Sequence, residues 1–487
     1  MNNHQKPLRW TLLATLATAV AAMPITALAE NREITTGTEV DPGPVSYQSS
    51  ATAPALTVIN DGTSYSGTGI SISLNESATG LGLYGVRLYH GSSVALSNST
   101  VAVSATSGAG IRVEPSGSST TFSFENLLID ITGVNGWGIS QHTGIVTGTG
   151  LTITGSVNGA RGIQTAGMQG ALPGYTSVDT FTINLSGNEV IGIVPNLVGA
   201  SDLFSMSNGT IVVSGTDAYG AFIASSVSTT LTNVNITATG NGSSGIIVSG
   251  LYANDHSLVV DGGSIQGNNA ITISGQNADE IIFRNGATIA GSILATGTAT
   301  STITVESNSS LAGTVTNDST GAMDLTLSNA TWASAGSSNM NNLTLEGATL
   351  ALELTSLEDQ ITVANTLTLK NTSTMTVLLG NGILEDILKE GETGDITLDV
   401  NSLITGASVQ TEEDADLAYI LTGTGIRNSA GSTYTISEQG DGVYRVSDIN
   451  YISAVPEPAV FAVLAGLVML AWAMRRRRLT VLCAHCR

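Results

Sequence analysis

The sequence predicts an all-β fold, a right-handed parallel β-helix with a β-rich cap at its C-terminal end. Apolar and polar residues alternate with period two over many short segments, and no window shows a convincing helical period. These segments recur at roughly 18 to 29 residues, the length of one β-helix coil, with Gly and Asn between them. A β-sandwich would need aromatic cores, and seven Phe and four Trp are too few.

Residues 1–29 have the three parts of a secretory signal peptide. Lys6 and Arg9 make a basic start, and an apolar stretch runs from Trp10 to Ala22. Ala27 and Ala29 then supply the small-x-small cleavage pattern, which leaves Glu30 as the first mature residue. We therefore expect export, followed by a linker over residues 30–55.

Residues 56–345 carry the repeats of the expected β-helix. Val94–Val103 alternates and leads to Gly110–Val113, and the next copy runs from Phe122–Ile131 to Gly138–Ile139. Further copies begin near Leu151, Phe204, Leu231, Leu258, Ile281, Ile303, Leu325 and Leu343. We expect inward Val, Ile, Leu and Phe to stack from coil to coil, with Ser, Thr and Asn facing outward. Gly and Asn suit the corners because left-handed backbone costs them little.

The composition changes near residue 345, and residues 346–450 are expected to form the β-rich cap. Strand patterns continue at Leu367–Leu369 and Met375–Leu379, and a last pair is expected at Tyr434–Ser437 and Val443–Val446. This pattern resembles the C-terminal end of autotransporter passenger domains, although no outer-membrane barrel sequence follows it.

Residues 451–478 form a three-part tail. The motif Val455-Pro456-Glu457-Pro458 precedes an apolar run from Ala459 to Met474, residues 459–474. Sixteen helical residues span about 24 Å, and Trp472 and snorkelling arginines can supply the remainder of a membrane crossing. The run stops at four arginines, Arg475, Arg476, Arg477 and Arg478, which the positive-inside bias places in the cytoplasm with residues 479–487.

The motif, the apolar helix and the basic stop together resemble the PEP-CTERM sorting signal of surface and biofilm-associated proteins in diderm bacteria. The resemblance covers about residues 455–478. It implies an inner-membrane precursor that an exosortase, a membrane-embedded cysteine protease, reads and cleaves after secretion by the general machinery. The implied destination is the cell surface or the extracellular matrix.

The expected mature segment, residues 30–454, is strongly acidic. It holds 37 acidic and nine basic residues, a formal charge of about −28. Nucleic acid and anionic lipid are disfavoured as partners because both require cationic neutralisation. Both cysteines, Cys483 and Cys486, lie beyond the apolar run, and their CxxC spacing lacks the second pair of a zinc site.

The sequence contains no catalytic motif, and we expect no enzymatic activity, cofactor or metal. Glycan-cleaving β-helices cluster their carboxylates, whereas here they are scattered, and the adjacent Asp279 and Glu280 are expected on opposite faces. Isolated acidic residues of this kind are Asp130, Asp217, Asp255 and Asp261. Four arginines recur at similar coil positions, either lining one groove or serving as solubilising residues: Arg87, Arg112, Arg161 and Arg284. His90, His142 and His256 lie in separate coils.

Threonine supports a binding alternative. Thr-x-Thr pairs occur at Thr147/Thr149, Thr152/Thr154, Thr230/Thr232, Thr237/Thr239, Thr302/Thr304 and Thr314/Thr316. Stacked Thr-x-Thr ladders are the means by which several ice-binding β-helices order water. That interpretation requires one face and a regular coil length, and these coils vary in length.

We therefore expect an exported, non-enzymatic structural or adhesive rod that presents many contacts along a stiff scaffold, with an extracellular polysaccharide as a possible partner. The competing hypothesis is a β-helical polysaccharide lyase or hydrolase, and an ice- or glycan-binding solenoid is a third.

Overall fold

The computed structural model describes residues 31–450 except 115–118, 167–173, 197–201, 225–227, 250–255, 276–278, 299, 307, 380–392, 407, 413, 423–434 and 441–442. Strands account for 66% of the described structure, and the fold is a parallel β-solenoid of about 13 turns. The chain divides into two compact units. One holds the solenoid to Leu350 with Ile361–Thr374 and Thr405–Ala418, and the other holds Ala351–Gln360, Met375–Ile404 and the chain from Tyr419 onward.

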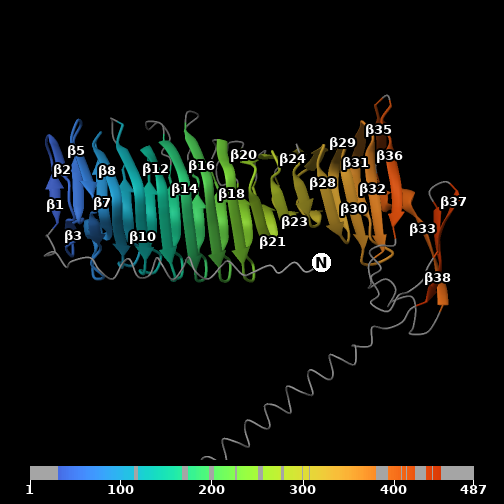
Figure 1. Cartoon of the computed structure of the whole chain (residues 1–487), viewed down its shortest axis with the longest axis horizontal. Coiled ribbons are helices and arrows are strands. Elements are labelled where there is room, and N and C mark those ends of the chain that lie inside the picture. The colour runs from blue at the N-terminus through green and yellow to red at the C-terminus, as the bar shows by residue number, and fades with distance from the viewer. Residues whose placement is uncertain are drawn as a thin grey trace, which may run out of the picture. The chain divides into compact units, whose positions relative to one another are not determined.

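Each coil in the middle of the solenoid has one short and one long strand (Figure 1). The short strands are β7 (Tyr84–Tyr89), β9 (Ala109–Val113), β11 (Trp137–Gln141), β13 (Arg161–Thr165), β15 (Ile191–Val194), β17 (Tyr219–Ile223) and β19 (Ser244–Val248). The long strands are β8 (Ser93–Val103), β10 (Thr121–Ile131), β12 (Gly144–Gly155), β14 (Gly174–Ser186), β16 (Leu203–Ser214) and β18 (Ser228–Thr239). Long strands pair in parallel with long strands of neighbouring coils, and short strands with short ones.

Shorter strands build the other coils. Before β7 come β1 (Arg32–Ile34), β2 (Thr38–Asp41), β3 (Ser46–Gln48), β4 (Leu56–Ile59), β5 (Ser64–Thr68), β6 (Ser71–Ser73) and the 3-10 turn η2 (Gly80–Leu83). After β19 come β20 (His256–Asp261), β21 (Ser264–Ile273), β22 (Asp279–Arg284), β23 (Thr288–Ala295), β24 (Ser301–Glu306), β25 (Ser310–Ala312), β26 (Val315–Asn317), β27 (Met323–Ser328), β28 (Thr331–Ala335), β29 (Ser338–Glu346), β31 (Ile361–Lys370) and β35 (Ser408–Thr411). Strands β1, β2 and β3 pair in parallel with β4, β5 and β6, so the first coil lies within residues 30–55, where a linker was expected.

The strand register holds although the coil length changes. Leu325 pairs with Leu343, 18 residues later, whereas Gly144 pairs with Gly174, 30 residues later. In each pairing an inward-facing residue lies opposite an inward-facing residue of the neighbouring coil, because an inward position must stay inward in every coil. The variation in coil length therefore falls outside the paired strand positions.

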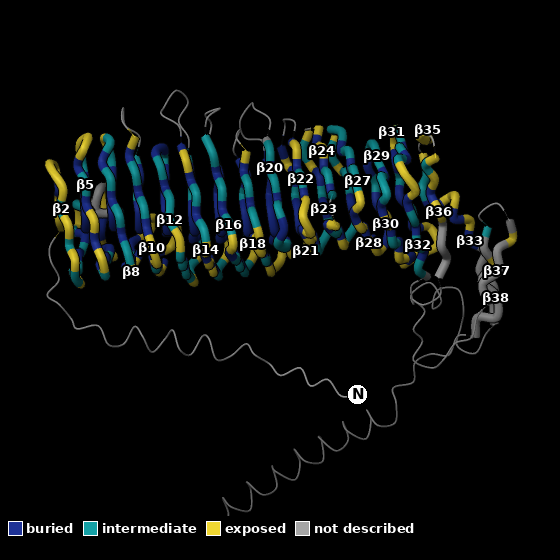
Figure 2. The backbone as a smooth tube through the Cα atoms, turned by 45° about the horizontal axis from the view of Figure 1, so that its top comes forward, coloured by how far each residue is buried: buried dark blue, intermediate teal, exposed yellow. Residues whose placement is uncertain are grey.

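One inward position shows how the core is built. A single file of paired residues runs through the first half of the long strands and then through β20, β22, β24, β27, β29 and β31. Its members are Tyr65, Val94, Phe122, Val146, Thr176, Phe204, Thr229, Leu258, Ile281, Ile303, Leu325, Leu343 and Leu367. All are buried. Figure 2 shows the resulting alternation of buried and more exposed positions along the strands.

Each long strand bends at one residue in left-handed backbone, and we call these residues the bend file. In β8 to β18 they are Asn98, Asn126, Gly150, Thr180, Asn208 and Asn233, with φ between 48° and 74°. Asparagine side chains connect neighbouring coils here, since Nδ2 of Asn126 donates to Oδ1 of Asn98 at 3.1 Å and Nδ2 of Asn233 donates to Oδ1 of Asn208 at 3.2 Å. Asn208, Asn233 and Asn285 have positive φ, in agreement with the expectation that asparagine occupies positions of left-handed backbone.

The short strands carry a file of stacked glycines. Its members are Gly85, Gly110, Gly138, Gly162, Gly192, Gly220 and Gly245. A Cβ on Gly138 would lie 2.6 Å from the carbonyl oxygen of Gly162 in the next coil, and one on Gly110 would lie 2.8 Å from that of Gly138. Only glycine allows this approach of two backbones. Gly110 and Gly138, which the sequence places at the start of short strand segments, lie at the second position of β9 and of β11.

The second unit contains most of β30 (Thr349–Leu354) and β32 (Ser373–Leu379), and an antiparallel sheet of β33 (Thr393–Asp399), β37 (Thr435–Gly440) and β38 (Val443–Asn450). The last strand pair expected from the sequence is confirmed as β37 and β38. The 3-10 turn η3 (Val400–Leu403) follows β33, and Oδ1 of Asp399 accepts from the backbone N of Asn401. The remaining strands are β34 (Ile404–Thr405) and β36 (Leu417–Thr422).

Among residues 31–450, with the gaps given above, no helix has the length and hydropathy of a membrane span. The sorting motif Val455–Pro458, the basic stop Arg475–Arg478 and the cleavage residues Ala27 and Ala29 lie outside the described residues.

Candidate functional site

A groove follows the bend file across five adjacent long strands, β10, β12, β14, β16 and β18. It has a volume of about 480 Å³. Its lining residues are Asn126, Gly150, Leu151, Thr152, Thr180, Phe181, Thr182, Asn208, Gly209, Thr210, Asn233 and Asn235, and we call it the Thr/Asn groove. Five strands spaced about 4.8 Å apart give it a length of about 19 Å along the solenoid.

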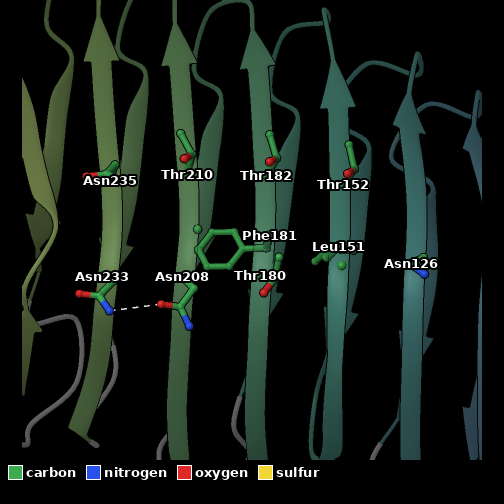
Figure 3. A pocket seen from close by; sticks show the side chains of 12 residues that line it. Asn126, Leu151, Thr152, Thr180, Phe181, Thr182, Asn208, Thr210, Asn233 and Asn235 are labelled. Carbon is green, nitrogen blue, oxygen red and sulfur yellow. Dashed lines mark hydrogen bonds between the residues drawn. The ribbon is translucent and has the colours of Figure 1, made fainter. Parts of the chain in front are cut away.

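Two parallel rows of polar side chains border the groove (Figure 3). One row belongs to the bend file and is interrupted at Gly150, which has no side chain. The other is an outward file two residues further along each strand, made by Thr152, Thr182, Thr210 and Asn235. The register places these four residues opposite one another in successive coils, so the same kind of polar group repeats at the strand spacing.

Apolar side chains form the floor between the two rows. The ring of Phe181 lies between them in Figure 3, and its register partner in the next coil is Gly209. A Cβ on Gly209 would collide with that ring, so glycine at this position leaves room for the aromatic side chain. Leu151 precedes Phe181 in the same file, and both residues are buried. The groove therefore offers a narrow apolar strip between hydroxyl and amide groups.

The lining residues carry no formal charge. A carboxylate lies at the edge of the groove, where Oδ1 of Asp179 accepts from Oγ of Ser207 and from Nδ2 of Asn208, both at 2.7 Å. These hydrogen bonds lower the pKa of the Asp179 carboxyl, and the bond from Ser207 has the largest effect. Asp179 therefore orients the amide of Asn208, which in turn accepts from Asn233.

The lining of the groove offers hydrogen-bonding groups and contains no titratable side chain. Hydroxyl and carboxamide groups both donate and accept hydrogen bonds, as do the hydroxyl groups of a neutral sugar. General acid or base catalysis needs a titratable group within reach of the reacting atom, and the lining contains neither carboxylate nor imidazole. A smaller hollow of about 260 Å³ lies on β5, β8 and β10 and includes Glu125.

The scattered acidic residues do not converge. Asp130 accepts from Oγ1 of Thr154, Asp217 occupies a positive-φ turn, and Asp261 pairs with Arg284 at 2.8 Å. Asp279 is buried while Glu280 is exposed, which confirms that alternation turns them to opposite faces. Asp255 lies outside the described residues. In the described part of the chain no group of three or more His, Cys, Asp or Glu residues is arranged to hold a metal ion.

The arginines separate into two places. Arg87 and Arg112 are register partners on β7 and β9, and Arg161 lies on β13 of the same face. Glu114 joins the first pair, with its Oε2 2.6 Å from Nη2 of Arg87 and its Oε1 3.6 Å from Nε of Arg112. Arg284 lies on β22 in the file of Asp261, so the hypothesis that all four line one groove is wrong.

His142 joins the arginine face, and its Nδ1 lies 3.3 Å from Nη2 of Arg112. Burial, with the charge of Arg112 in second place, lowers the pKa of His142 to about 4. His90 packs against Tyr89 at 4.8 Å between ring centroids, two coils earlier. The histidines thus lie in separate coils as expected.

The Thr-x-Thr pairs lie on three faces. Thr147/Thr149, Thr230/Thr232 and Thr302/Thr304 precede the bend, Thr152/Thr154 and Thr237/Thr239 follow it, and Thr316 lies on β26. The sequence did not reveal that serine and threonine occupy the same outward position in successive coils. The outward file before the bend contains Ser66, Ala95, Ser123, Thr147, Ser177, Ser205, Thr230, Val259, Ile282, Thr304, Thr326, Thr344 and Thr368.

A scan against protein-family models and a search of curated proteins return no match for this chain.

Proposed function

We propose that this protein is an exported, non-enzymatic surface rod that binds an extended neutral polysaccharide along the Thr/Asn groove. The observation that carries the proposal is the uncharged groove over five coils, in which hydroxyl and amide side chains repeat in register beside an apolar floor. A polymer with repeated hydroxyl groups and apolar ring faces matches this surface better than a small molecule, which would need a concave, enclosing pocket.

The charge distribution supports a neutral ligand. The mature segment carries a formal charge of about −28, so a polyanion is repelled at long range. Because the groove itself is uncharged, a neutral chain can enter it without leaving a desolvated charge unpaired. Many weak contacts along one rigid scaffold then add up, as expected for multivalent binding.

A matched pair of variants tests the groove. Thr182→Glu places a charge in the middle of the groove. Thr288→Glu makes the same change in the same outward file, but four coils further along the solenoid and outside the groove. Both threonines are exposed, so both variants are expected to fold. We expect Thr182→Glu to weaken retention on neutral polysaccharide columns at least tenfold while Thr288→Glu behaves like wild type. Equal retention of both variants would show that the polysaccharide does not bind in the Thr/Asn groove.

Delivery to the surface rests on the sequence. In this proposal the chain is a right-handed β-helix cut after Ala29, anchored by residues 459–474 and released when an exosortase cleaves at Val455–Pro458. Mass spectrometry of the mature C-terminus tests this in wild-type and exosortase-deletion cells. We expect the segment after the motif to be lost only when the protease is present. An intact C-terminus in both strains would indicate a permanent anchor instead.

The competing function is a polysaccharide lyase or hydrolase, and the arginine face with Glu114 and His142 is the observation in its favour. A hydrolase needs two carboxyl groups about 5–9.5 Å apart, and the described part of this face holds only Glu114. Release of reducing ends or unsaturated sugars from acidic polysaccharides, abolished by Glu114→Gln, would support the enzyme. The rod proposal expects no such release.

A further inference from the structure

Positive charge gathers on one face of this acidic protein, away from the Thr/Asn groove. Residues 30–454 contain seven arginines, and three of them lie on four consecutive short strands, β7, β9, β11 and β13. Two files of register partners lie there, and all their members are partly exposed except Ala109 and Ser140, which are buried. One runs Tyr84, Ala109, Trp137 and Arg161, and the other runs Arg87, Arg112, Ser140 and Gln164.

The described residues of this face leave positive charge in excess. Arg87, Arg112 and Arg161 face a single carboxylate, Glu114, which contacts the first two. Nε of Arg112 is buried without a hydrogen bond to any described residue. Segments 115–118 and 167–173, which follow β9 and β13 in the chain, have the sequences Pro-Ser-Gly-Ser and Gly-Met-Gln-Gly-Ala-Leu-Pro and so contribute no carboxylate.

Arg161 is the member whose charge is least balanced. Its Nη1 donates to Oε1 of Gln164 at 2.7 Å, and no ion pair to it occurs among the residues that the structure describes. Burial lowers its pKa, which means that the cation loses hydration without gaining an opposite charge. A desolvated cation without an anion is costly, and an anionic ligand offsets that cost.

Trp137 gives the site an apolar surface beside this cation. It is the register partner of Arg161 in the preceding coil, and the two strands are about 4.8 Å apart. Both side chains are half-buried. Gln164, in the parallel file, is half-buried and adds a carboxamide whose Nε2 can donate to a ligand hydroxyl, whereas Ser140 is buried and its Oγ accepts from Nη1 of Arg112 at 2.7 Å.

We propose that Trp137 and Arg161 form a binding site for an anionic sugar, a pyranose bearing a carboxylate. The carboxylate pairs with the planar guanidinium of Arg161, which matches it with two parallel hydrogen bonds. The ring packs on the Trp137 indole, and Gln164 meets a hydroxyl group. The ligand carries few charges, because the long-range field of the protein opposes a polyanion. This site is independent of the neutral groove and goes beyond the proposed function.

Binding of glucuronate to the full-length chain, measured by ligand-observed NMR and titration calorimetry, tests the proposal. Glucose, acetate and inorganic phosphate are the comparison probes. We expect glucuronate to bind at least tenfold more tightly than glucose, which lacks the carboxylate, and than acetate, which lacks the ring. Equal binding of glucose would overturn the role of Arg161. Binding of acetate or phosphate as tight as that of glucuronate would reduce the site to a simple anion site and overturn the sugar.

Variants assign the roles of the two side chains. Arg161→Gln is expected to weaken glucuronate binding at least tenfold, and Arg161→Lys, which keeps the charge but loses the planar fork, to weaken it less. Trp137→Leu is expected to weaken glucuronate binding while acetate binding stays unchanged. Arg284→Gln is the matched control, because Arg284 pairs with Asp261 on another face. Wild-type affinity in folded Arg161→Gln, or an equal loss in Arg284→Gln, would contradict the proposal.

Discussion

His142 is the side chain for which the structure predicts the clearest dependence on pH. Its ring is half-buried beside Arg112, and burial lowers its pKa to about 4, from an unfolded value near 6.5. Between these values the unfolded chain binds more protons than the folded one, so the free energy of unfolding falls as the pH drops from about 6.5 to 4. The full shift corresponds to about 3.4 kcal/mol, and because the ring is only partly buried, solvent screening reduces the loss to about 2 kcal/mol.

Thermal melting at pH 7 and pH 5 measures this effect. We expect the melting temperature of wild type to fall more between the two pH values than that of His142→Asn, whose side chain does not titrate. An identical pH dependence in the two proteins would show that His142 is not held in its neutral form.

Gly138 tests the close approach of the short strands. Because a Cβ would lie 2.6 Å from the carbonyl oxygen of Gly162, Gly138→Ala must push two coils apart, at a cost of about 1–3 kcal/mol. Gly43→Ala is the control, since a Cβ there meets nothing within 4 Å. The measurement is the denaturant midpoint of both variants. A midpoint for Gly138→Ala equal to that of Gly43→Ala would refute the tight packing.

At the scale of the strand, the bend file explains why the long strands turn without a loop. Asn208 has φ of +53°, a conformation that asparagine and glycine adopt at low cost. Its Nδ2 donates to Asp179, and its Oδ1 accepts from Asn233. The bend thus combines a backbone preference with side-chain hydrogen bonds to the coils on both sides, and it also shapes the border of the Thr/Asn groove.

Two substitutions at Asn208 separate these contributions. Asn208→Gly keeps the backbone conformation and removes only the side-chain hydrogen bonds, whose net value is about 0.5–1.5 kcal/mol each. Asn208→Val removes the same bonds and adds the strain of a β-branched residue at positive φ, about 1–3 kcal/mol. We therefore expect the melting temperature to fall more for Val than for Gly. The reverse order would mean that the bend is not governed by backbone conformation.

Period-two alternation predicts many of the solenoid strands and inward residues after residue 55, but not β1, β2 and β3, which lie where a linker is expected. Phe204, Leu258, Ile281, Ile303 and Leu325 were each read as the start of a copy, and all five lie in one buried file. Leu151 and Leu231 were read in the same way but belong to other files, because Leu151 follows the bend and Leu231 lies two residues past Thr229. Local alternation fixes the side of a strand that a residue faces, but not its coil partner.

The candidate sites depend on those coil partners. The Thr/Asn groove requires Thr152, Thr182 and Thr210 to be opposite one another, and the chain intervals between them differ, 30 residues and then 28. Variable coil length in the sequence argues against aligned faces, but in the structure the paired strands keep their register despite it. The same reasoning explains why Arg161 could not be distinguished from Arg284 in the sequence.

At the scale of the whole solenoid, each coil contacts mainly its two neighbours, so stabilising contacts extend along one axis, and the proposed binding groove follows the same axis. Affinity for a groove that crosses five coils should therefore increase with the length of the ligand, whereas affinity for a single pocket depends only on the sugar unit that fills it. This difference separates a polymer-binding rod from a protein that recognises one sugar unit.

The most direct test of the rod is titration calorimetry of the full-length chain with neutral glucan, mannan and chitin oligosaccharides from disaccharide to octasaccharide. The account predicts that affinity for at least one series rises with chain length until the ligand spans about 19 Å, the distance across five neighbouring strands, and then levels off. It also predicts that Thr182→Glu removes this rise and Thr288→Glu keeps it. Affinity that does not depend on length, or no binding in any series, would contradict the account.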